Sequence, residues 1–208
     1  LKANGFKVGF TSTAIFNDGK KEWLNDKKMT MLGRFFTQKI LREMVNNGCQ
    51  YAIVETTSEG IRQYRHRFIN YDVLVFTGIY PEHIESHGSF ENYKKAKGEL
   101  FKHLKKCKKK FSNDRNEVVQ SATGLKKIDL NRIRKTVVVN GDDKYVDYFL
   151  EFWSEQKIVF GKKLNDIVES DGLKIVKATK TSSSKNGISF IALDTLFDLQ
   201  LLGSFNVM

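Results

Sequence analysis

The stretch from Glu55 to Leu104 reads ETTSEGIRQYRHRFINYDVLVFTGIYPEHIESHGSFENYKKAKGELFKHL and is dense in acidic, imidazole, hydroxyl, guanidinium and ammonium groups. The apolar run Asp72–Phe76 lies inside it, and the run Tyr51–Val54 comes directly before it. Continuous apolar, β-branched runs of this length are typical of buried strands in a parallel sheet. Ligands of open α/β sheets bind just beyond the carboxyl ends of the strands, where Glu55 and Thr77 lie in sequence. The stretch therefore predicts a binding site at one edge of a parallel sheet.

Strands and helices alternate on both sides of this stretch. We expect further strands at Lys7–Phe10, Thr136–Asn140 and Lys157–Phe160. The expected helices, indicated by apolar spacing and possible capping residues, are Arg34–Asn47, Ser58–Arg65, a long helix starting at Phe90, and Lys144–Trp153. This repeated alternation predicts the α/β class, with a mostly parallel sheet flanked by helices.

The pattern changes at Leu173. Leu173–Lys180 and Ile188–Leu193 are separated by a serine-rich turn ending in Asn186-Gly187, which predicts a β-hairpin, and Thr195–Leu201 would add a third strand. We expect one domain over residues 1–208, with a parallel α/β core at 1–170 and a small antiparallel β-subdomain at 171–208. The polar stretch Ser112–Asn116 is expected to be a loop.

The net charge of +11 raises the question of nucleic acid or anionic lipid binding, with Lys94–Phe111 (KKAKGELFKHLKKCKKKF) as the candidate segment. Its apolar residues recur at three- and four-residue steps, which indicates an amphipathic helix with its lysines in water. The pattern therefore argues against a nucleic-acid interface.

No apolar run approaches the roughly 18 residues of a membrane helix, and no signal-peptide pattern opens the chain, so we expect a cytoplasmic protein without a membrane span. Cys49 and Cys107 lie far apart in sequence and indicate reduced thiols, with neither a disulfide framework nor a zinc spacing.

The motifs of the quoted stretch follow the order found in the central, ATP-binding domain of the Mur ligases. In the subgroup of these enzymes that adds the third residue of the peptide, the domain carries E-V-S-S-H-G-L-x-Q-x-R, then F-T-N-L-x-x-D-H-L-D-Y-H-G, then Y-x-x-A-K. The matching residues here are Glu55, Thr57, Ser58, Gly60, Gln63, Arg65, Phe76, Thr77, His83, His87, Gly88, Tyr93, Ala96 and Lys97. Met29–Met31, Val139–Asp143 and Leu202–Val207 resemble three further motifs. The resemblance covers nearly the whole chain and is greatest to the subgroup that adds the third residue of the peptide.

This resemblance implies part of an ATP-dependent ligase that adds an amino acid to a UDP-N-acetylmuramoyl-peptide during peptidoglycan precursor synthesis. In the family, ATP phosphorylates the substrate carboxylate and an amine attacks the acyl phosphate, while Mg²⁺ neutralises the crowded charges. The family's Gly-Thr-Asn-Gly-Lys-Thr phosphate loop and its N- and C-terminal domains are missing from this sequence. We therefore expect a fragment that is inactive alone.

The resemblance also implies roles for single residues. Glu55 and His83 correspond to metal ligands, and Lys97 to a lysine that carbon dioxide carbamylates so that it supports a second metal. The residues at the family's substrate-binding positions are Thr30, Ser58, Gln63 and Arg65. Asn206 corresponds to a residue close to the adenine of the nucleotide.

Each assignment has a plainer alternative. Glu55 would be an acid near a helix dipole, His83 a surface-loop histidine, and Lys97 one more solvated lysine. Positions 58, 63 and 65 would belong to a capped surface helix.

Four departures from the family pattern bear on activity: Glu59 stands in place of His, Gly78 in place of Asn, Glu82 in place of Asp and Leu32 in place of Pro. They leave open a divergent ligase or a decayed site that now binds an anion or nucleic acid. A folylpolyglutamate or cyanophycin synthetase would share the fold and the metal chemistry, but would not account for Ser58, Gln63 and Arg65 together.

Overall fold

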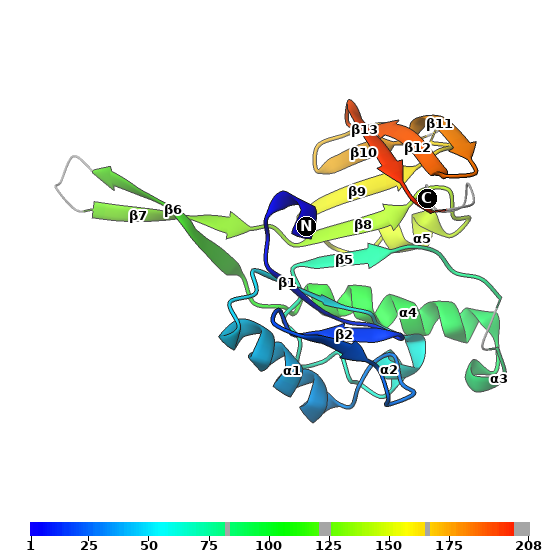
Figure 1. The fold of residues 1–208 in the computed structure, drawn as a ribbon, viewed down its shortest axis with the longest axis horizontal. Coiled ribbons are helices and arrows are strands. Elements are labelled where there is room, and N and C mark those ends of the chain that lie inside the picture. The colour runs from blue at the N-terminus through cyan, green and yellow to red at the C-terminus, as the bar shows by residue number, and fades with distance from the viewer. Residues whose placement is uncertain (82–83, 121–125, 165–166, 202–208) are drawn as a thin grey trace. The chain divides into compact units, whose positions relative to one another are not determined.

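The computed structural model describes residues 1–81, 84–120, 126–164 and 167–201 (Figure 1). They form two compact units. The first unit comprises Leu1–Ile69 and Pro81–His103, and the second comprises Asn70–Tyr80 and the described residues from Leu104 onward. The expected α/β class, with a parallel sheet, helices and an antiparallel sheet near the C-terminus, is confirmed.

The first unit is built on a four-stranded sheet with the order β3-β2-β1-β4. Its strands are β1 (Val8–Thr11), β2 (Ile15–Asn17), β3 (Glu22–Leu24) and β4 (Tyr51–Val54), preceded by a 3₁₀ turn at Lys2–Asn4. β1 pairs parallel with β4, and β2 pairs antiparallel with both β1 and β3. The β2–β3 hairpin was not predicted, because its strands have only three residues each.

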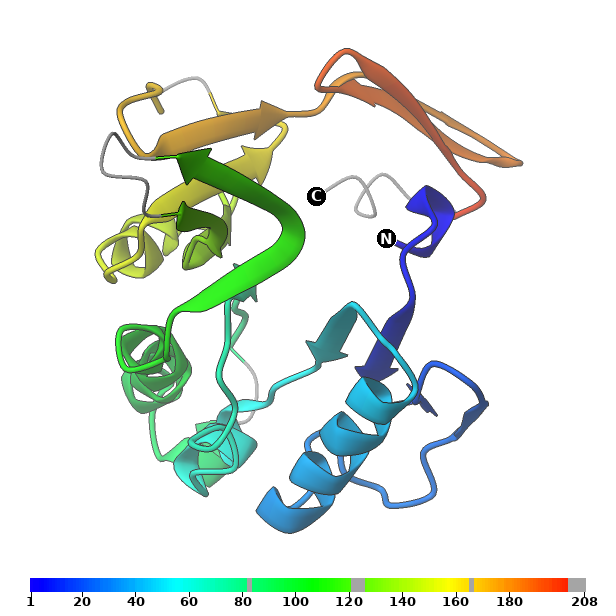
Figure 2. The same ribbon diagram turned by 90° about the vertical axis from the view of Figure 1, so that its left-hand side faces the viewer.

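Helix α1 (Arg34–Asn46) lies beside this sheet (Figure 2). Its buried residues Ile40 and Met44 share a core with Phe16 and Leu32. The helix approaches β1 so closely that a Cβ at Gly9 would lie 2.5 Å from Met44 Cγ. Gly9 therefore sets the distance between helix and sheet.

The first unit also contains helices α2 (Ser58–Arg62) and α3 (Ile84–His87) and all of α4 (Phe90–Leu104) except its last residue. Thr57 caps α2, because its hydroxyl accepts a hydrogen bond from the backbone N–H of Gly60 at 3.1 Å. The prediction that the lysine-rich helix continues to Phe111 is wrong. The helix ends at Leu104, and Lys110 instead begins a strand and binds Asp72.

The second unit contains a parallel sheet with the order β10-β9-β8-β5. Its strands are β5 (Val73–Phe76), β8 (Thr136–Asn140), β9 (Gln156–Gly161) and β10 (Leu173–Lys177). The core includes fully buried valines of β8 and β9 and the ring of Phe149 on α5 (Val146–Leu150), which stacks 3.8 Å from Phe76.

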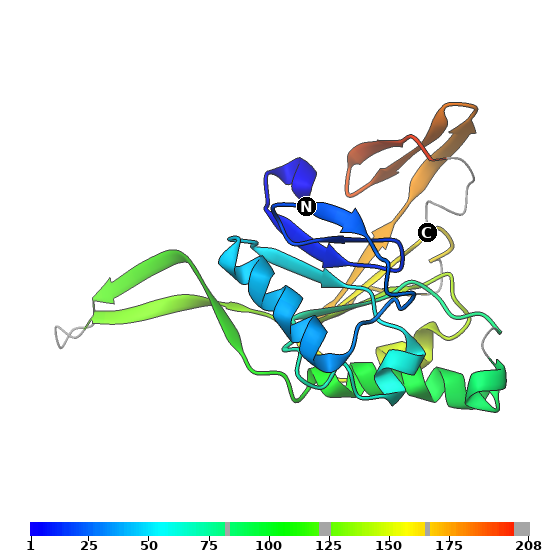
Figure 3. The same ribbon diagram turned by 60° about the horizontal axis from the view of Figure 1, so that its bottom comes forward.

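The small antiparallel sheet consists of β11 (Thr179–Ser184), β12 (Gly187–Ala192) and β13 (Thr195–Leu199). Its hairpin differs from the expected one. Leu173–Lys177 pairs parallel with β9, and the chain runs on into β11, which pairs with β12 (Figure 3). The apolar residues of β10 extend the larger sheet, whereas the serine-rich segment forms a strand.

Strands β6 (Lys110–Gln120) and β7 (Lys126–Ile133) form a two-stranded antiparallel ribbon. The expected loop at Ser112–Asn116 is wrong, since these residues lie within β6. The register shifts between Phe111 and Asn116, so the polar residues coincide with an irregularity in the strand pairing. All five residues are polar, so the segment lacks the alternation of apolar and polar residues that predicts a strand.

The expected burial of β4 and β5 on both faces is also wrong. Tyr51 and Ile53 of β4 and Val73 and Val75 of β5 are each more than 40% exposed. Each strand is the outermost of its sheet in the described part of the chain. Apolar runs do not distinguish such a strand from one covered on both faces.

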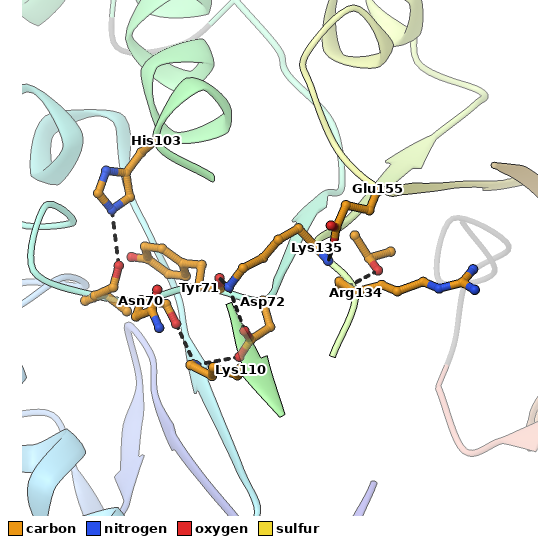
Figure 4. A network of polar contacts seen from close by, with 10 residues as sticks. Asn70, Tyr71, Asp72, His103, Lys110, Arg134, Lys135 and Glu155 are labelled. Atoms are coloured by element: carbon orange, nitrogen blue, oxygen red, sulfur yellow. Dashed lines mark hydrogen bonds and ion pairs between the residues drawn. The ribbon is translucent and has the colours of Figure 1, made fainter. Parts of the chain in front are cut away.

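A buried ammonium group anchors the amino ends of β5 and β8 (Figure 4). Lys135 is 2% exposed, and its Nζ donates to Asp72 Oδ1 at 2.8 Å and to the Tyr71 carbonyl at 2.6 Å. Lys110 Nζ contacts the other oxygen of Asp72 at 2.6 Å. The backbone N–H of Lys135 donates to Glu155 Oε2 at 2.8 Å, so the anchor reaches β9.

We predict that Asp72→Asn destabilises the protein by about 3–5 kcal/mol, because it leaves the buried ammonium without its carboxylate. Urea unfolding measures the change. Asp26→Asn, which removes an exposed ion pair with Lys27, is the control and is expected to cost less than about 1 kcal/mol. An Asp72 variant as stable as this control would contradict the assignment.

His66 gives the first unit a pH-dependent stability. It is 4% exposed, and burial lowers its pKa from 6.5 to about 4. The nearby charges of His103 and Arg67 contribute to this shift of the pKa, and Glu99 opposes it. Between pH 6.5 and about 4, His66 is protonated in the unfolded chain and neutral in the folded chain. The free energy of unfolding therefore falls as the pH falls through this range.

We predict that lowering the pH from about 7 to about 4.5 costs roughly 2–3 kcal/mol through His66. His66→Phe removes the titrating group while keeping an aromatic ring. Its urea unfolding free energy should vary less with pH than that of the unsubstituted protein. Equal pH dependence in the two proteins would refute this role of His66.

Candidate functional site

Glu55 follows β4 directly, at the carboxyl end of the parallel pair β1–β4. Its backbone N–H donates to the Thr11 carbonyl at 3.0 Å, which continues the ladder by one residue. Its side chain is bound by Thr13, from the connection between β1 and β2. The backbone N–H of Thr13 donates to Oε2 at 2.8 Å and its hydroxyl to Oε1 at 3.0 Å. One residue therefore orients an otherwise exposed carboxylate.

Thr30 lies next to this pair. Its Oγ1 is 2.8 Å from Thr13 Oγ1. The loop that carries Thr30 is held by Asn25, whose side-chain amide donates to the carbonyls of Ser12, Thr13 and Met29 at 2.9–3.1 Å. The structure therefore brings the expected substrate residue Thr30 and the expected metal ligand Glu55 together through Thr13.

Gln63 and Arg65 form a second polar group. Gln63 Nε2 donates to Glu59 Oε1 at 2.8 Å, and its Oε1 accepts a hydrogen bond from Arg65 Nη2. Arg65 Nη1 donates to the Met31 carbonyl, directly after Thr30. Two of the expected substrate residues thus contact each other, and one binds the backbone beside a third.

Helix α2 and the segment that carries Thr30 and Met31 are packed tightly together. Met31 is 1% exposed, and a Cβ at Gly60 would lie 2.7 Å from its sulfur. Glycine at this position of α2 therefore permits the approach.

Ser58 is separate from these groups. Both Ser58 and His87 are more than nine-tenths buried, and Ser58 Oγ lies 3.0 Å from His87 Nε2. Asn92 Nδ2 donates to the His87 carbonyl at 3.0 Å, and the His87 ring lies 5.2 Å from that of Tyr93. The Ser58 hydroxyl therefore joins α2 to the segment that precedes α4.

Lys97 lies on α4 one turn after Tyr93. Its ammonium is 5.1 Å from the centre of the Tyr93 ring, and the residue is half-buried, whereas Lys95 is exposed. The two lysines therefore differ in environment, although they are neighbours in a lysine-rich helix.

Two of the expected site residues, His83 and Asn206, lie outside the described residues. Within the described ranges, no group of three or more His, Cys, Asp or Glu side chains is placed to hold a metal ion. The same ranges contain no helix that is long and apolar enough to cross a membrane. Cys49 and Cys107 are free thiols, and burial raises the pKa of Cys107.

The segment Asn140–Asp143 joins the carboxyl ends of three strands in the second unit. Asn140 Nδ2 donates to the Thr77 carbonyl at 2.8 Å, and Asp143 Oδ2 accepts the Ile79 N–H at 2.9 Å, which ties β8 to the end of β5. Asp142 accepts the backbone N–H groups of residues 162 and 163, after β9, at 2.8 and 2.7 Å. These side chains fix the edge at which open parallel sheets bind ligands.

Sequence reasoning missed Thr13 and Asn25 as members of the site, and it noted Glu59 only as a departure from the family pattern. Thr13 could have been found by the rule that selected Glu55, because it also follows a strand closely. Nothing in the sequence indicates that Asn25 reaches three carbonyls, since that depends on the path of the loop.

The sequence profile of the Mur ligase middle domain matches residues 2–134, and the chain belongs to this family. UDP-N-acetylmuramyl-tripeptide synthetases of Roseiflexus sp. (strain RS-1) and Borreliella afzelii (strain PKo) are each 30% identical to it over its whole length. A UDP-N-acetylmuramoyl-L-alanyl-D-glutamate--2,6-diaminopimelate ligase of Geobacillus kaustophilus (strain HTA426) is 24% identical over 99% of the chain. The chain spans 36–37% of the length of these relatives.

Solved structures agree on the fold. A UDP-N-acetylmuramoyl-L-alanyl-D-glutamate--2,6-diaminopimelate ligase superposes with a TM-score of 0.67 at 18% identity, covering 99% of this chain and 36% of that one. MurF from Acinetobacter baumannii superposes with a TM-score of 0.50 at 15% identity, covering 80% and 30%. The middle-domain fold is therefore shared within the family despite low identity.

Proposed function

We propose that this chain is the middle domain of an ATP-dependent ligase that adds an amino acid to a UDP-N-acetylmuramoyl-peptide. The reaction would form an acyl phosphate on the substrate, which the amine of the amino acid attacks. The observation that supports this best is the group Thr30–Thr13–Glu55 at the carboxyl end of β1 and β4. We place the enzyme in the cytoplasm, where ATP is available.

The donor chemistry of Glu55 suits Mg²⁺, which prefers oxygen ligands and commonly binds one or two carboxylates. Each carboxylate oxygen has about two acceptor sites, and the described contacts use one on each. We propose Glu55 and His83 as metal ligands and a carbamylated Lys97 as the support of a second metal. Bound Mg²⁺ would neutralise negative charge during phosphoryl transfer.

We propose that Arg65, Gln63, Thr30 and Ser58 bind the muramoyl-peptide. The Arg65 guanidinium has five N–H donors, so it can bind a substrate carboxylate as well as its protein acceptors. Its bond to the Met31 carbonyl fixes its position beside Thr30. Asn206 would lie near the adenine.

We propose that residues 1–208 act as one middle domain, with a parallel core at 1–170 and the antiparallel subdomain beyond it. The other domains of the ligase, and the loop that holds the ATP phosphates, would come from outside these residues. The two substrates would then meet at this domain.

The direct test is an assay of the full-length protein with ATP, Mg²⁺, a UDP-N-acetylmuramoyl-dipeptide and single amino acids. Formation of an amide product together with one phosphate per turnover supports the proposal. Phosphate release that does not depend on the muramoyl-peptide would refute it.

The 208-residue chain alone is predicted to release no phosphate from ATP. Its sequence lacks the Gly-rich loop and lysine that bind nucleotide phosphates. Mg²⁺-dependent phosphate release from the purified chain would contradict this expectation.

In the full-length enzyme, Lys97→Ala should lower turnover about 10-fold to 100-fold, because the second metal loses its anionic support. Bicarbonate should not restore the activity, whereas a small carboxylate such as acetate should restore part of it. Steady-state rates at saturating Mg²⁺ measure both effects.

Lys95→Ala is the matched control, since this exposed neighbour removes the same charge from the same helix. If the two variants lose equal activity, or if Lys97→Ala keeps near-normal turnover, then Lys97 does not support a metal and the proposal for it is refuted.

A further inference from the structure

We infer that Thr13 is a positioning residue that links the metal-binding carboxylate to the substrate-binding threonine. The inference rests on the proposed function of Glu55 and Thr30. Thr13 itself belongs to none of the motifs that suggested this function. Its role follows from three contacts that meet at one exposed residue, two through its hydroxyl and one through its backbone N–H.

Thr13 fixes the orientation of the Glu55 carboxylate. Thr13 binds both carboxylate oxygens, one through its backbone N–H and the other through its hydroxyl. A glutamate side chain loses considerable rotamer freedom when it is fixed, and an exposed one has little packing to fix it. Two bonds from a single residue therefore hold the carboxylate plane in a defined direction before a cation binds.

The carboxylate of Glu55 also sets the direction of the hydrogen bonds in this group. An ionised carboxylate only accepts, so the single hydroxyl hydrogen of Thr13 points to Glu55 Oε1. The 2.8 Å contact between the two hydroxyls must then be donated by Thr30. The order of donation is Thr30 to Thr13 to Glu55.

This order has a consequence for the substrate. The only hydrogen of the Thr30 hydroxyl is committed to Thr13, so Thr30 presents lone pairs to a ligand. The Thr30 oxygen therefore accepts a hydrogen bond from an N–H or O–H of the muramoyl-peptide, such as a peptide amide or a sugar hydroxyl. It does not donate a hydrogen bond to a carbonyl of the substrate. The proposed metal site and the proposed substrate site are therefore joined by one chain of hydrogen bonds.

The test compares Thr13→Val with Thr13→Ser in the full-length enzyme. Valine keeps the branched shape and the backbone N–H but loses the hydroxyl, whereas serine keeps it. Because Thr13 is exposed, neither change is expected to unfold the protein, and thermal unfolding checks this; Thr13→Ala is the second variant if Thr13→Val does not fold.

Thr13→Val should weaken the binding of Mn²⁺ alone by roughly 10-fold to 100-fold, measured by electron paramagnetic resonance. It should also raise KM for the muramoyl-peptide. Thr13→Ser should stay within about threefold of the unsubstituted enzyme in both quantities.

Thr56→Val is the matched control. Thr56 is adjacent to Glu55, its hydroxyl donates to the Val54 carbonyl at 3.1 Å, and the family motif has valine at this position. It should leave Mn²⁺ affinity and KM unchanged. Losses as large as those of Thr13→Val would overturn the inference.

Glu55→Gln separates this inference from the proposed function. If Glu55→Gln leaves Mn²⁺ binding and turnover unchanged, the proposed metal site fails and the role of Thr13 fails with it. If Glu55→Gln abolishes Mn²⁺ binding while Thr13→Val binds it normally, only the inference about Thr13 is overturned. Loss in both variants, with rescue by serine, supports it.

Discussion

The parallel pairing of β1 with β4 is the constraint on which the candidate site depends. The register aligns Thr11 with Val54, so the residues that follow the two strands emerge at the same edge. The bond from the Glu55 N–H to the Thr11 carbonyl extends this pairing past the last strand residue. A shift of register by one residue would turn the side chains of β4 to the opposite face. The contact between Glu55 and the β1–β2 connection is thus a consequence of backbone pairing.

The second unit holds its parallel strands by polar contacts at both ends. At the amino ends, the buried ammonium of Lys135 joins the strands through Asp72 and a backbone carbonyl. At the carboxyl ends, the Asn140 amide donates a hydrogen bond to a backbone carbonyl that follows β5. The carboxylates of Asp142 and Asp143 accept hydrogen bonds from backbone N–H groups that follow β9 and β5. The middle of the sheet is apolar. Connections at the carboxyl edge are therefore fixed by directional bonds, which suits an edge that presents a ligand.

Much of the fold could be predicted from the sequence because its strands are short apolar runs followed by polar residues. The predictions failed where tertiary contacts outweigh local pattern. The apolar spacing continues to Phe111, but α4 ends at Leu104 and Lys110 pairs with Asp72. Tyr51 and Ile53 look like core residues, yet burial depends on which layers cover an outermost strand.

In the candidate site, too, the residues of local motifs could be predicted and those placed by tertiary contacts could not. The grouping of Gln63 with Arg65 follows from a short motif on one segment, and the motif itself indicated both residues. Thr13 and Asn25 come from connections whose paths are set by the β2–β3 hairpin and its neighbours. Short-range patterns in the sequence do not encode such contacts, which is why these residues were missed.

Glu59, which replaces the family's histidine, fixes the orientation of the Gln63 amide together with Arg65. Because a carboxylate accepts and a guanidinium donates, the amide nitrogen must face Glu59 and the amide oxygen must face Arg65. The reversed amide would place two acceptors together on one side and two donors on the other. The Gln63 amide is therefore held in one orientation. Its second amide hydrogen stays available to a bound peptide, and its direction is set by Glu59 and Arg65.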